Sequence, residues 1–416
     1  MTDYSDPLGK YPFYPDQDQL LVTRGDEVVD TLPCHRTAID PQAEPFTSRH
    51  THGHIGRTSD GTLYVAVDNE YSVLLASDDE GVTWSRINDA PPNGAITVLQ
   101  DDSFIVAATE QNEQGRMRLF FHRSTDRGRS FDRIASIDPA PFPNVFGDGN
   151  ILELQDGTLL CPAQHMDQCD IEPEKLNQMY LGALWMRRAA QYMVRSDDQG
   201  QTWQSGLDTH FWSALLDSNL NIFALGPHGG NPGPGGTFPG CWETNVNQLP
   251  NGRVMAVLRY SGPQQPWHHD VAEAWNAGDP DIHGRMFRTV VLSDSDDGGI
   301  TWQPMRPVAD ANGRAMLQMN DTNGHVVSLP DGRLLLVYVR RDPNDAMQLM
   351  ALLSDDDGQS WQPDTYNLQA GFGYPSSLVL DDGTVVTVTG RAVNDKTGKP
   401  LIPFDAQVIR WKPKPA

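Results

Sequence analysis

One short phrase of sequence is written five times along the chain. Each copy reads Ser-x-Asp-x-Gly-x, then Thr or Ser, then Trp or Phe, and the copies begin at Ser77, Ser124, Ser196, Ser295 and Ser354. The aspartate can accept hydrogen bonds from nearby backbone N–H groups, and the glycine permits the positive φ of a chain reversal. Each copy therefore predicts a tight turn between two strands.

A second marker, an Asp-Gly or Asn-Gly turn signal followed by an apolar strand, precedes most copies. Examples are SDGTLYVAV from Ser59 and PDGRLLLVY from Pro330. Each unit then reads as strand, turn, strand, phrase turn, strand. Repetition of a short unit built from strands is typical of a β-propeller, whose blades have four strands each, so the chain is expected to be all-β. Six units predict six blades, and the last, Asp382 to Pro413, keeps the marker but lacks the phrase.

The repeats also predict the domain organisation. We expect a single β-propeller domain over residues 1–416, with an N-terminal strand near QLLVTRGDEVVDT pairing into the last blade and closing the ring. Insertions interrupt the repeats near 166–192 and 262–287. A short helix is expected in the first insertion, where it could lie over the pocket or at a subunit contact of a homo-oligomer.

Composition excludes several classes of protein. The formal net charge of −24 argues against a nucleic-acid partner and against an acidic membrane surface. No apolar run approaches the ~20 residues of a membrane span, and the polar start lacks a signal-peptide pattern. We therefore expect either a cytoplasmic protein or one whose leader has been removed. The sequence contains four cysteines and no CxxC pair, which favours buried thiols over a zinc site; a disulfide stays open only for an oxidising compartment.

The repeated phrase resembles the Asp-box, or BNR repeat, of the sialidase (neuraminidase) superfamily, and the resemblance covers nearly the whole chain. It implies a six-bladed β-propeller whose Asp-box turns lie on the outer rim, away from the pocket, without a catalytic role. It also implies a carbohydrate-active enzyme without a cofactor, a hydrolase of the sialidase type that removes a terminal acidic sugar from a glycan.

Two stretches resemble the sialidase segments that contain the catalytic residues. In WETNVNQLPNGRVMAVLR, Glu243 falls at the glutamate that polarises a tyrosine, and Arg259 at an arginine that binds the substrate carboxylate. In GYPSSLVLDDGTVVTV, Tyr374 falls at the nucleophilic tyrosine. A neutral phenol suits this substrate, because a carboxylate beside the anomeric carbon would repel an Asp or Glu nucleophile.

Further arginines complete the expected carboxylate clamp. Arg340 or its neighbour Arg341 lies at the end of LLLVYVRR, in a position similar to the third arginine of sialidases. Arg391 is a further candidate at the corresponding end of the last blade. The guanidinium fork matches a carboxylate with two parallel hydrogen bonds, which is why arginine suits this role better than lysine.

The first blade departs from the sialidase pattern. The stretch SRHTHGHIGRTSDG lacks the Arg-Ile-Pro triplet expected there, and His50, His52 and His54 alternate instead, which places them on one face of a strand. Asp68 or Glu70, in the short loop that follows, is expected to substitute for the sialidase acid.

These histidines support two other interpretations. The enzyme could be a polysaccharide lyase or atypical glycosidase acting on uronate-containing glycans, with His52 as base and His165 in the same pocket. It could instead be a non-catalytic propeller that binds glycans. A metal site built from His50, His52 and His54 is a weaker alternative, because no acidic or cysteine partner is apparent, so no metal is expected.

Overall fold

The structure is a computed structural model of the chain. The residues that it describes are 18–39, 52–68, 72–137, 145–147, 149–166, 189–204, 211–212, 240–262, 287–317, 321–341, 347–370, 372–394 and 400–416. They form strands and turns and contain no helix. Within this part of the chain, no helix is long and apolar enough to cross a membrane. The bulk of the two predicted insertions, with the short helix expected in the first, lies outside the described residues.

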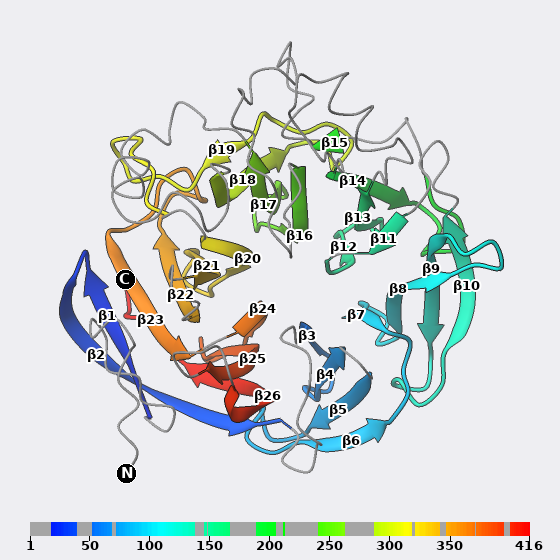
Figure 1. Cartoon of the computed structure of the whole chain (residues 1–416), viewed down its shortest axis with the longest axis horizontal. Helices are drawn as coiled ribbons and strands as arrows, with labels where there is room; N and C mark the ends of the chain where they lie inside the picture. The colour runs from blue at the N-terminus through cyan, green and yellow to red at the C-terminus, as the bar shows by residue number, and fades with distance from the viewer. Residues whose placement is uncertain are drawn as a thin grey trace, which may run out of the picture.

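Four antiparallel-rich sheets are arranged as a ring around a central axis (Figure 1). Two sheets have four strands each, in the orders β3-β4-β5-β6 and β10-β9-β8-β7. Their bounds are β3 (His52–Arg57), β4 (Leu63–Asp68), β5 (Val73–Ser77), β6 (Ser85–Asn88), β7 (Gly94–Val98), β8 (Phe104–Gln111), β9 (Met117–Ser124) and β10 (Asp132–Ile137). The strands β3, β7, β12, β16, β20 and β24 lie nearest the centre (Figure 1).

A third sheet of nine strands continues the ring. It contains β11 (Val145–Gly147), β12 (Leu152–Glu153), β13 (Leu159–Met166), β14 (Ala189–Ser196), β15 (Phe211–Trp212), β16 (Gly240–Gln248), β17 (Val254–Gly262), β18 (Phe287–Ser295) and β19 (Arg306–Pro307). Two repeat units are joined in this sheet by a single parallel contact between Ala189 of β14 and Gly240 of β16.

The fourth sheet also joins two repeat units, and the N-terminal hairpin lies between them. Its strands are β20 (Asp321–Ser328), β21 (Leu334–Arg341), β22 (Met347–Ser354), β23 (Asp364–Ala370), β1 (Gln19–Arg24), β2 (Glu27–Ala38), β26 (Pro400–Trp411), β25 (Val385–Asn394) and β24 (Phe372–Val379). β1 pairs with β23, and β2 pairs with β26, so the N-terminal segment follows the outside of the ring and links its last two units (Figure 1).

Packing between neighbouring units holds the ring together. β21 is apolar along most of its length because both of its faces are buried. Leu335, Val337 and Val339 pack into one hydrophobic cluster, while Leu334 and Leu336 face the cluster on the other side. The period-2 alternation of a strand thus serves two cores rather than a core and solvent. The same continuous apolar pattern in other strands at the middle of a sheet indicates that neighbouring sheets pack face to face.

The five repeated phrases form one turn with the same hydrogen bonds. In the first copy, Asp79 Oδ1 accepts from the backbone N–H of Thr83 at 2.8 Å, and Oδ2 accepts from the Thr83 hydroxyl at 2.6 Å. Ser77 Oγ donates to Asp79 and accepts from the N–H of Gly81, whose φ is 87°. The other four copies repeat these contacts. The predicted turn chemistry is therefore present in all five copies.

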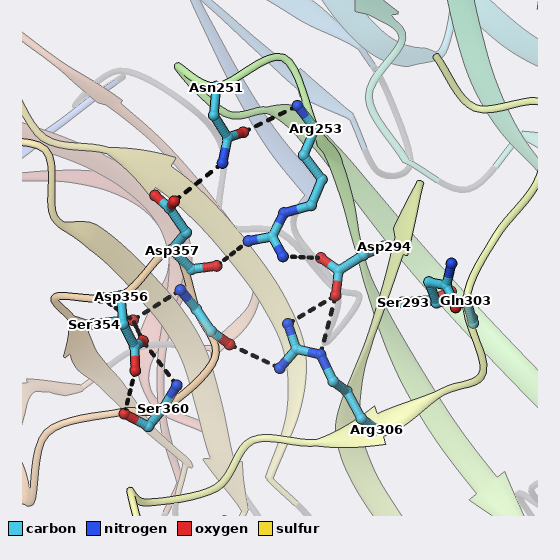
Figure 2. Close-up of polar contacts among 11 residues, drawn as sticks. Asn251, Arg253, Ser293, Asp294, Gln303, Arg306, Ser354, Asp356, Asp357 and Ser360 are labelled. Carbon is cyan, nitrogen blue, oxygen red and sulfur yellow. Dashed lines mark hydrogen bonds and ion pairs between the residues drawn. The ribbon is translucent and has the colours of Figure 1, made fainter. Parts of the chain in front are cut away.

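Arginines connect these turns to the neighbouring unit. Figure 2 shows Arg306 bonded through two nitrogens to Asp294. Nη1 of Arg306 also donates to the backbone carbonyl of Gly358, 2.7 Å away. Arg253 donates to the adjacent carbonyl of Asp357. A pocket of about 480 Å³ opens here, lined by Asn251, Gly252, Arg253, Asp296, Asp356, Asp357 and Gln359. It lies between the marker turn that joins β16 to β17 and the repeated turns that follow β18 and β22.

Candidate active site

Three side chains of different chemistry meet at the Glu243 carboxylate. Its Oε1 accepts a hydrogen bond of 2.7 Å from the Tyr374 hydroxyl and one of 2.6 Å from Nη1 of Arg259. Its Oε2 accepts a hydrogen bond from the side-chain amide of Asn323. The side chains of Glu243 and Arg259 are only 10% and 11% exposed, so water screens this ion pair weakly. The arrangement presents a phenol to a carboxylate that is ready to accept its proton.

Three β-bulges deliver these side chains. The register of β16 shifts between Trp242 and Asn245, and Glu243 lies within the shift. Corresponding shifts surround Asn323 in β20 and Tyr374 in β24. A bulge inserts an extra residue, interrupts the hydrogen-bond ladder and re-aims a side chain. Because β16 lies beside β20 and β20 beside β24, the three bulges bring their side chains together (Figure 1).

Two of these residues have an unusual backbone. Glu243 has φ of 49° and Asn323 has φ of 56°, values that L-residues other than glycine seldom adopt. Such a conformation costs about 1–3 kcal/mol and persists only where the surrounding structure enforces it. The cost is smaller for asparagine, whose short side chain tolerates the left-handed region.

Both described arginines of the predicted clamp have carboxylate partners within the protein. Arg259 contacts Glu243, as described above. Arg340 binds Asp321 with its Nε and Nη2, each 3.1 Å from a carboxylate oxygen, and the Asp321 side chain is fully buried. Nη2 of Arg340 also contacts the Tyr338 hydroxyl at 3.2 Å, and burial raises the pKa of that phenol. The role of Arg340 in substrate binding stays a prediction.

The remaining predicted residues are described only in part. His52 and Asp68 face each other in the register of β3 and β4, but the structure describes the backbone alone at both. His54 lies two residues further along β3. The side chains of His165 in β13 and Arg391 in β25 are likewise not described, and His50 and Glu70 lie outside the described residues. The catalytic and binding roles given to these residues stay predictions.

Three cysteine thiols and one histidine imidazole are buried in the described part of the chain. Cys34, Cys161 and Cys241 are buried thiols, and burial raises the pKa of each. Burial lowers the pKa of His325, in β20, to about 4, which keeps the imidazole neutral. Cys169 lies outside the described residues. Among the residues that are described, no three His, Cys, Asp or Glu side chains gather as metal ligands would.

Asn323 is the member of the cluster that sequence reasoning missed. It is almost fully buried and lies 80 residues from Glu243 in sequence. A signal was present, because Asn323 precedes Leu329 by the same six residues that separate Glu243 from Leu249. Both leucines open the marker turn of their unit, and each donates its N–H to the carbonyl four residues later at 2.8 Å.

Comparison with known families gives the class of protein. Residues 103–387 match the BNR repeat-like domain. The match covers more than half of the chain, so the chain belongs to the BNR repeat-like domain family. The predicted relationship to proteins with BNR repeats is thereby confirmed.

Solved structures share the fold. The α-L-arabinofuranosidase of Fusarium graminearum is 13% identical with a TM-score of 0.59, over 90% of this chain and 97% of that one. A Dyadobacter fermentans protein of unknown function is 17% identical with a TM-score of 0.56, over 92% and 99%. The Trypanosoma rangeli sialidase is 14% identical with a TM-score of 0.51, over 91% and 59%. These likenesses show an all-β fold of the β-propeller type.

One curated relative matches part of the chain. The vacuolar protein sorting/targeting protein 10 of Colletotrichum graminicola is 30% identical over 118 residues, which cover 28% of this chain and 7% of that protein. The chain therefore spans a small fraction of the length of this relative.

Proposed function

We propose that the protein is a glycoside hydrolase in which Tyr374 and Glu243 form the reacting pair. The observation that carries the proposal is the 2.7 Å hydrogen bond from the Tyr374 hydroxyl to Glu243 Oε1. A phenol is a weak nucleophile until a neighbouring base accepts its proton, and Glu243 is placed to do so. The glycosidase folds of the structural neighbours are compatible with this reaction class.

The mechanism follows from these contacts. The Tyr374 oxygen attacks the anomeric carbon while its proton passes to Glu243, and the bond to the leaving group breaks. An acid protonates the leaving oxygen, and Asp68 remains the proposed acid. Water then cleaves the glycosyl–tyrosine bond, with overall retention of configuration. Arg259 stabilises the negative charge on Glu243 before the transfer, because it contacts the same carboxylate oxygen.

For the substrate, we propose first a terminal acidic sugar, as in the sialidase-type mechanism. The tyrosine nucleophile supports this choice, because a phenol avoids repulsion by a carboxylate beside the anomeric carbon.

A neutral sugar is a second candidate, and one observation favours it. Both oxygens of the buried Asp321 engage the fork of Arg340, which leaves less of that guanidinium for a substrate carboxylate. One structural neighbour is named for α-L-arabinofuranosides, which are neutral.

We further propose that the ring is a single domain with six blades. Six marker turns in the described part of the chain support this count. Each is opened by an N–H bonded to the carbonyl four residues later, at Thr58, Leu99, Leu154, Leu249, Leu329 and Leu380. Six hydrophobic clusters, each shared by neighbouring sheets or repeat units, support it as well.

The test compares wild type with Tyr374→Phe on aryl glycosides of acidic sugars and on aryl α-L-arabinofuranosides. Aryl release from either set that falls by about 10³-fold in Tyr374→Phe supports the proposal, and the set that reacts identifies the substrate charge. Release that survives the loss of the phenol would contradict the tyrosine mechanism. An absorbance rise from unsaturated uronates with polysaccharides would replace hydrolysis with a lyase reaction, and glycan binding without turnover would identify a binding protein.

A further inference from the structure

The repeat register assigns one equivalent position to every unit of the ring. Counting six residues back from the residue that opens each marker turn gives His52, Asn93, Asp148, Glu243, Asn323 and Tyr374. Asp148 lies outside the described residues, and the side chain of His52 is not described. The last three residues of the series meet at the site, where Asn323 and Tyr374 each donate a hydrogen bond to Glu243. Asn323 therefore occupies, in its own unit, the position that Glu243 and Tyr374 occupy in theirs.

Asn323 contacts the oxygen of Glu243 that the reaction leaves unused. Its Nδ2 donates to Oε2, whereas Tyr374 and Arg259 both donate to Oε1. Thr322 holds the other end of the amide, because its hydroxyl donates to Asn323 Oδ1 at 2.7 Å. Thr322 and Asn323 are both buried, so this chain of hydrogen bonds is shielded from water.

We propose that Asn323 is a positioning residue that fixes the rotation of the Glu243 carboxylate, so that Oε1 faces the Tyr374 hydroxyl. The inference rests on the function proposed above for Tyr374 and Glu243. A carboxylate held at one oxygen alone can rotate about its terminal bond, because that torsion is broad and roughly two-fold. A donor on Oε2 removes this freedom and also favours the ionised form that accepts the proton.

An amide suits this position better than a carboxylate. Aspartate at 323 would place a second negative charge against Glu243, and two carboxylates in contact share one proton. In the described part of the chain, Arg259 on β17 forms an ion pair with Glu243, and Asp321 on β20 forms a separate ion pair with Arg340 on β21. Arg259 donates to Oε1 through its Nη1, whereas Asn323 donates to Oε2.

The test uses Asn323→Gly, which removes the amide and keeps a residue that tolerates positive φ. We expect kcat to fall about 10- to 100-fold, with KM changed less than about threefold, because the amide acts on the base rather than on the substrate. Asn323→Asp should move the acid limb of the kcat–pH profile upward by about one unit or more. The matched control is Gln199→Gly, at an outer turn with φ of 57°, which should change neither quantity.

A second readout does not depend on turnover. The difference in phenolate absorbance between wild type and Tyr374→Phe reports the ionisation of Tyr374. In Asn323→Gly, that ionisation should begin at lower pH, by about half a unit, since the carboxylate no longer points at the phenol.

The two proposals fail in different ways. If Tyr374→Phe abolishes aryl release while Asn323→Gly matches wild type in kcat, pH profile and phenolate titration, the positioning role is wrong and the enzyme function stands. If no glycoside is cleaved, the function is wrong, and the phenolate titration alone decides the positioning role: a downward shift supports it and an unchanged titration overturns it. Thermal unfolding of each variant verifies that the fold is retained.

Discussion

The inner strands on two sides of the ring differ in one respect. β3 and β7 pair with their neighbours residue by residue, without a shift in register. β16, β20 and β24 each contain a shift near the same end, and these shifts carry Glu243, Asn323 and Tyr374. The outer turns, by contrast, repeat the same hydrogen bonds on both sides. The repeat builds the frame, and local departures from it place the reactive groups.

The physical reason lies in how strands direct side chains. In a regular strand, side chains alternate between the two faces, and in a stacked ring both faces belong to hydrophobic cores. A polar group in such a strand has few partners and would be costly to bury. A bulge releases one residue from the alternation and turns its side chain elsewhere. The bulged side of the ring can therefore hold a buried carboxylate together with its donors.

The largest effect on kcat should come from comparing one substitution on the bulged side of the ring with one on the regular side. Glu243→Gln removes the base on the bulged side, and we expect kcat on the responsive glycoside to fall about 10³-fold. His54→Ala changes the regular strand β3, and we expect a higher KM with kcat within about threefold, the pattern of a residue that only binds substrate. Steady-state kinetics distinguish the two. A loss of kcat in His54→Ala as large as that in Glu243→Gln would contradict the difference between the two sides and would favour a reaction that uses a histidine as base.

A smaller effect should come from two glycines that lie against backbone carbonyls. A Cβ at Gly149 would lie 1.9 Å from the Thr244 carbonyl oxygen, beside Glu243, and a Cβ at Gly94 would lie 2.2 Å from that of Ala107 on the regular side. Alanine at either position must displace backbone and should lower stability by about 1–3 kcal/mol. Gly149→Ala should also lower kcat about 100-fold, because a displacement of about 1 Å at the reacting pair is enough.

Gly94→Ala serves as the matched control for that substitution. It introduces a similar collision into β7, so its thermal unfolding should resemble that of Gly149→Ala while its kcat stays within about threefold of wild type. Equal losses of kcat in both variants would mean that the site depends on the stability of the whole ring rather than on the bulge in β16.

The sequence predicted the turns well because their contacts are local. The partners of Asp79 all lie within four residues of it, so the order of residue types is enough to specify the turn. Glu243 and Tyr374 were reached through motif resemblance, although 131 residues separate them. Asn323 was missed because the alternation of DTNGHVVS does not reveal a bulge. The pairing of Arg340 with Asp321 was missed because it depends on strand register, which places them opposite each other.

The smallest effect should come from the repeated turns, where the two sides are expected to behave alike. Hydrogen bonds from the hydroxyl and the N–H of Thr83 hold the pKa of Asp79 to about 2, and Ser360 makes the same contacts to Asp356 on the bulged side. Asp79→Ala and Asp356→Ala should each lower the melting temperature by about 1–3 °C, with kcat unchanged.

The effect of Asp79 on stability should also depend on pH. Because the folded-state pKa of Asp79 lies below the unfolded value of about 3.9, its contribution to the stability of the fold is complete above that pH and disappears as the pH falls through about 2. The gap in melting temperature between wild type and Asp79→Ala should therefore narrow from pH 4 to pH 2, as followed by circular dichroism. A gap that does not change over this range would show that the turn depends on the shape of the aspartate rather than on its charge, and a fall in kcat in Asp356→Ala alone would show that the outer turns on the bulged side do more than hold the frame.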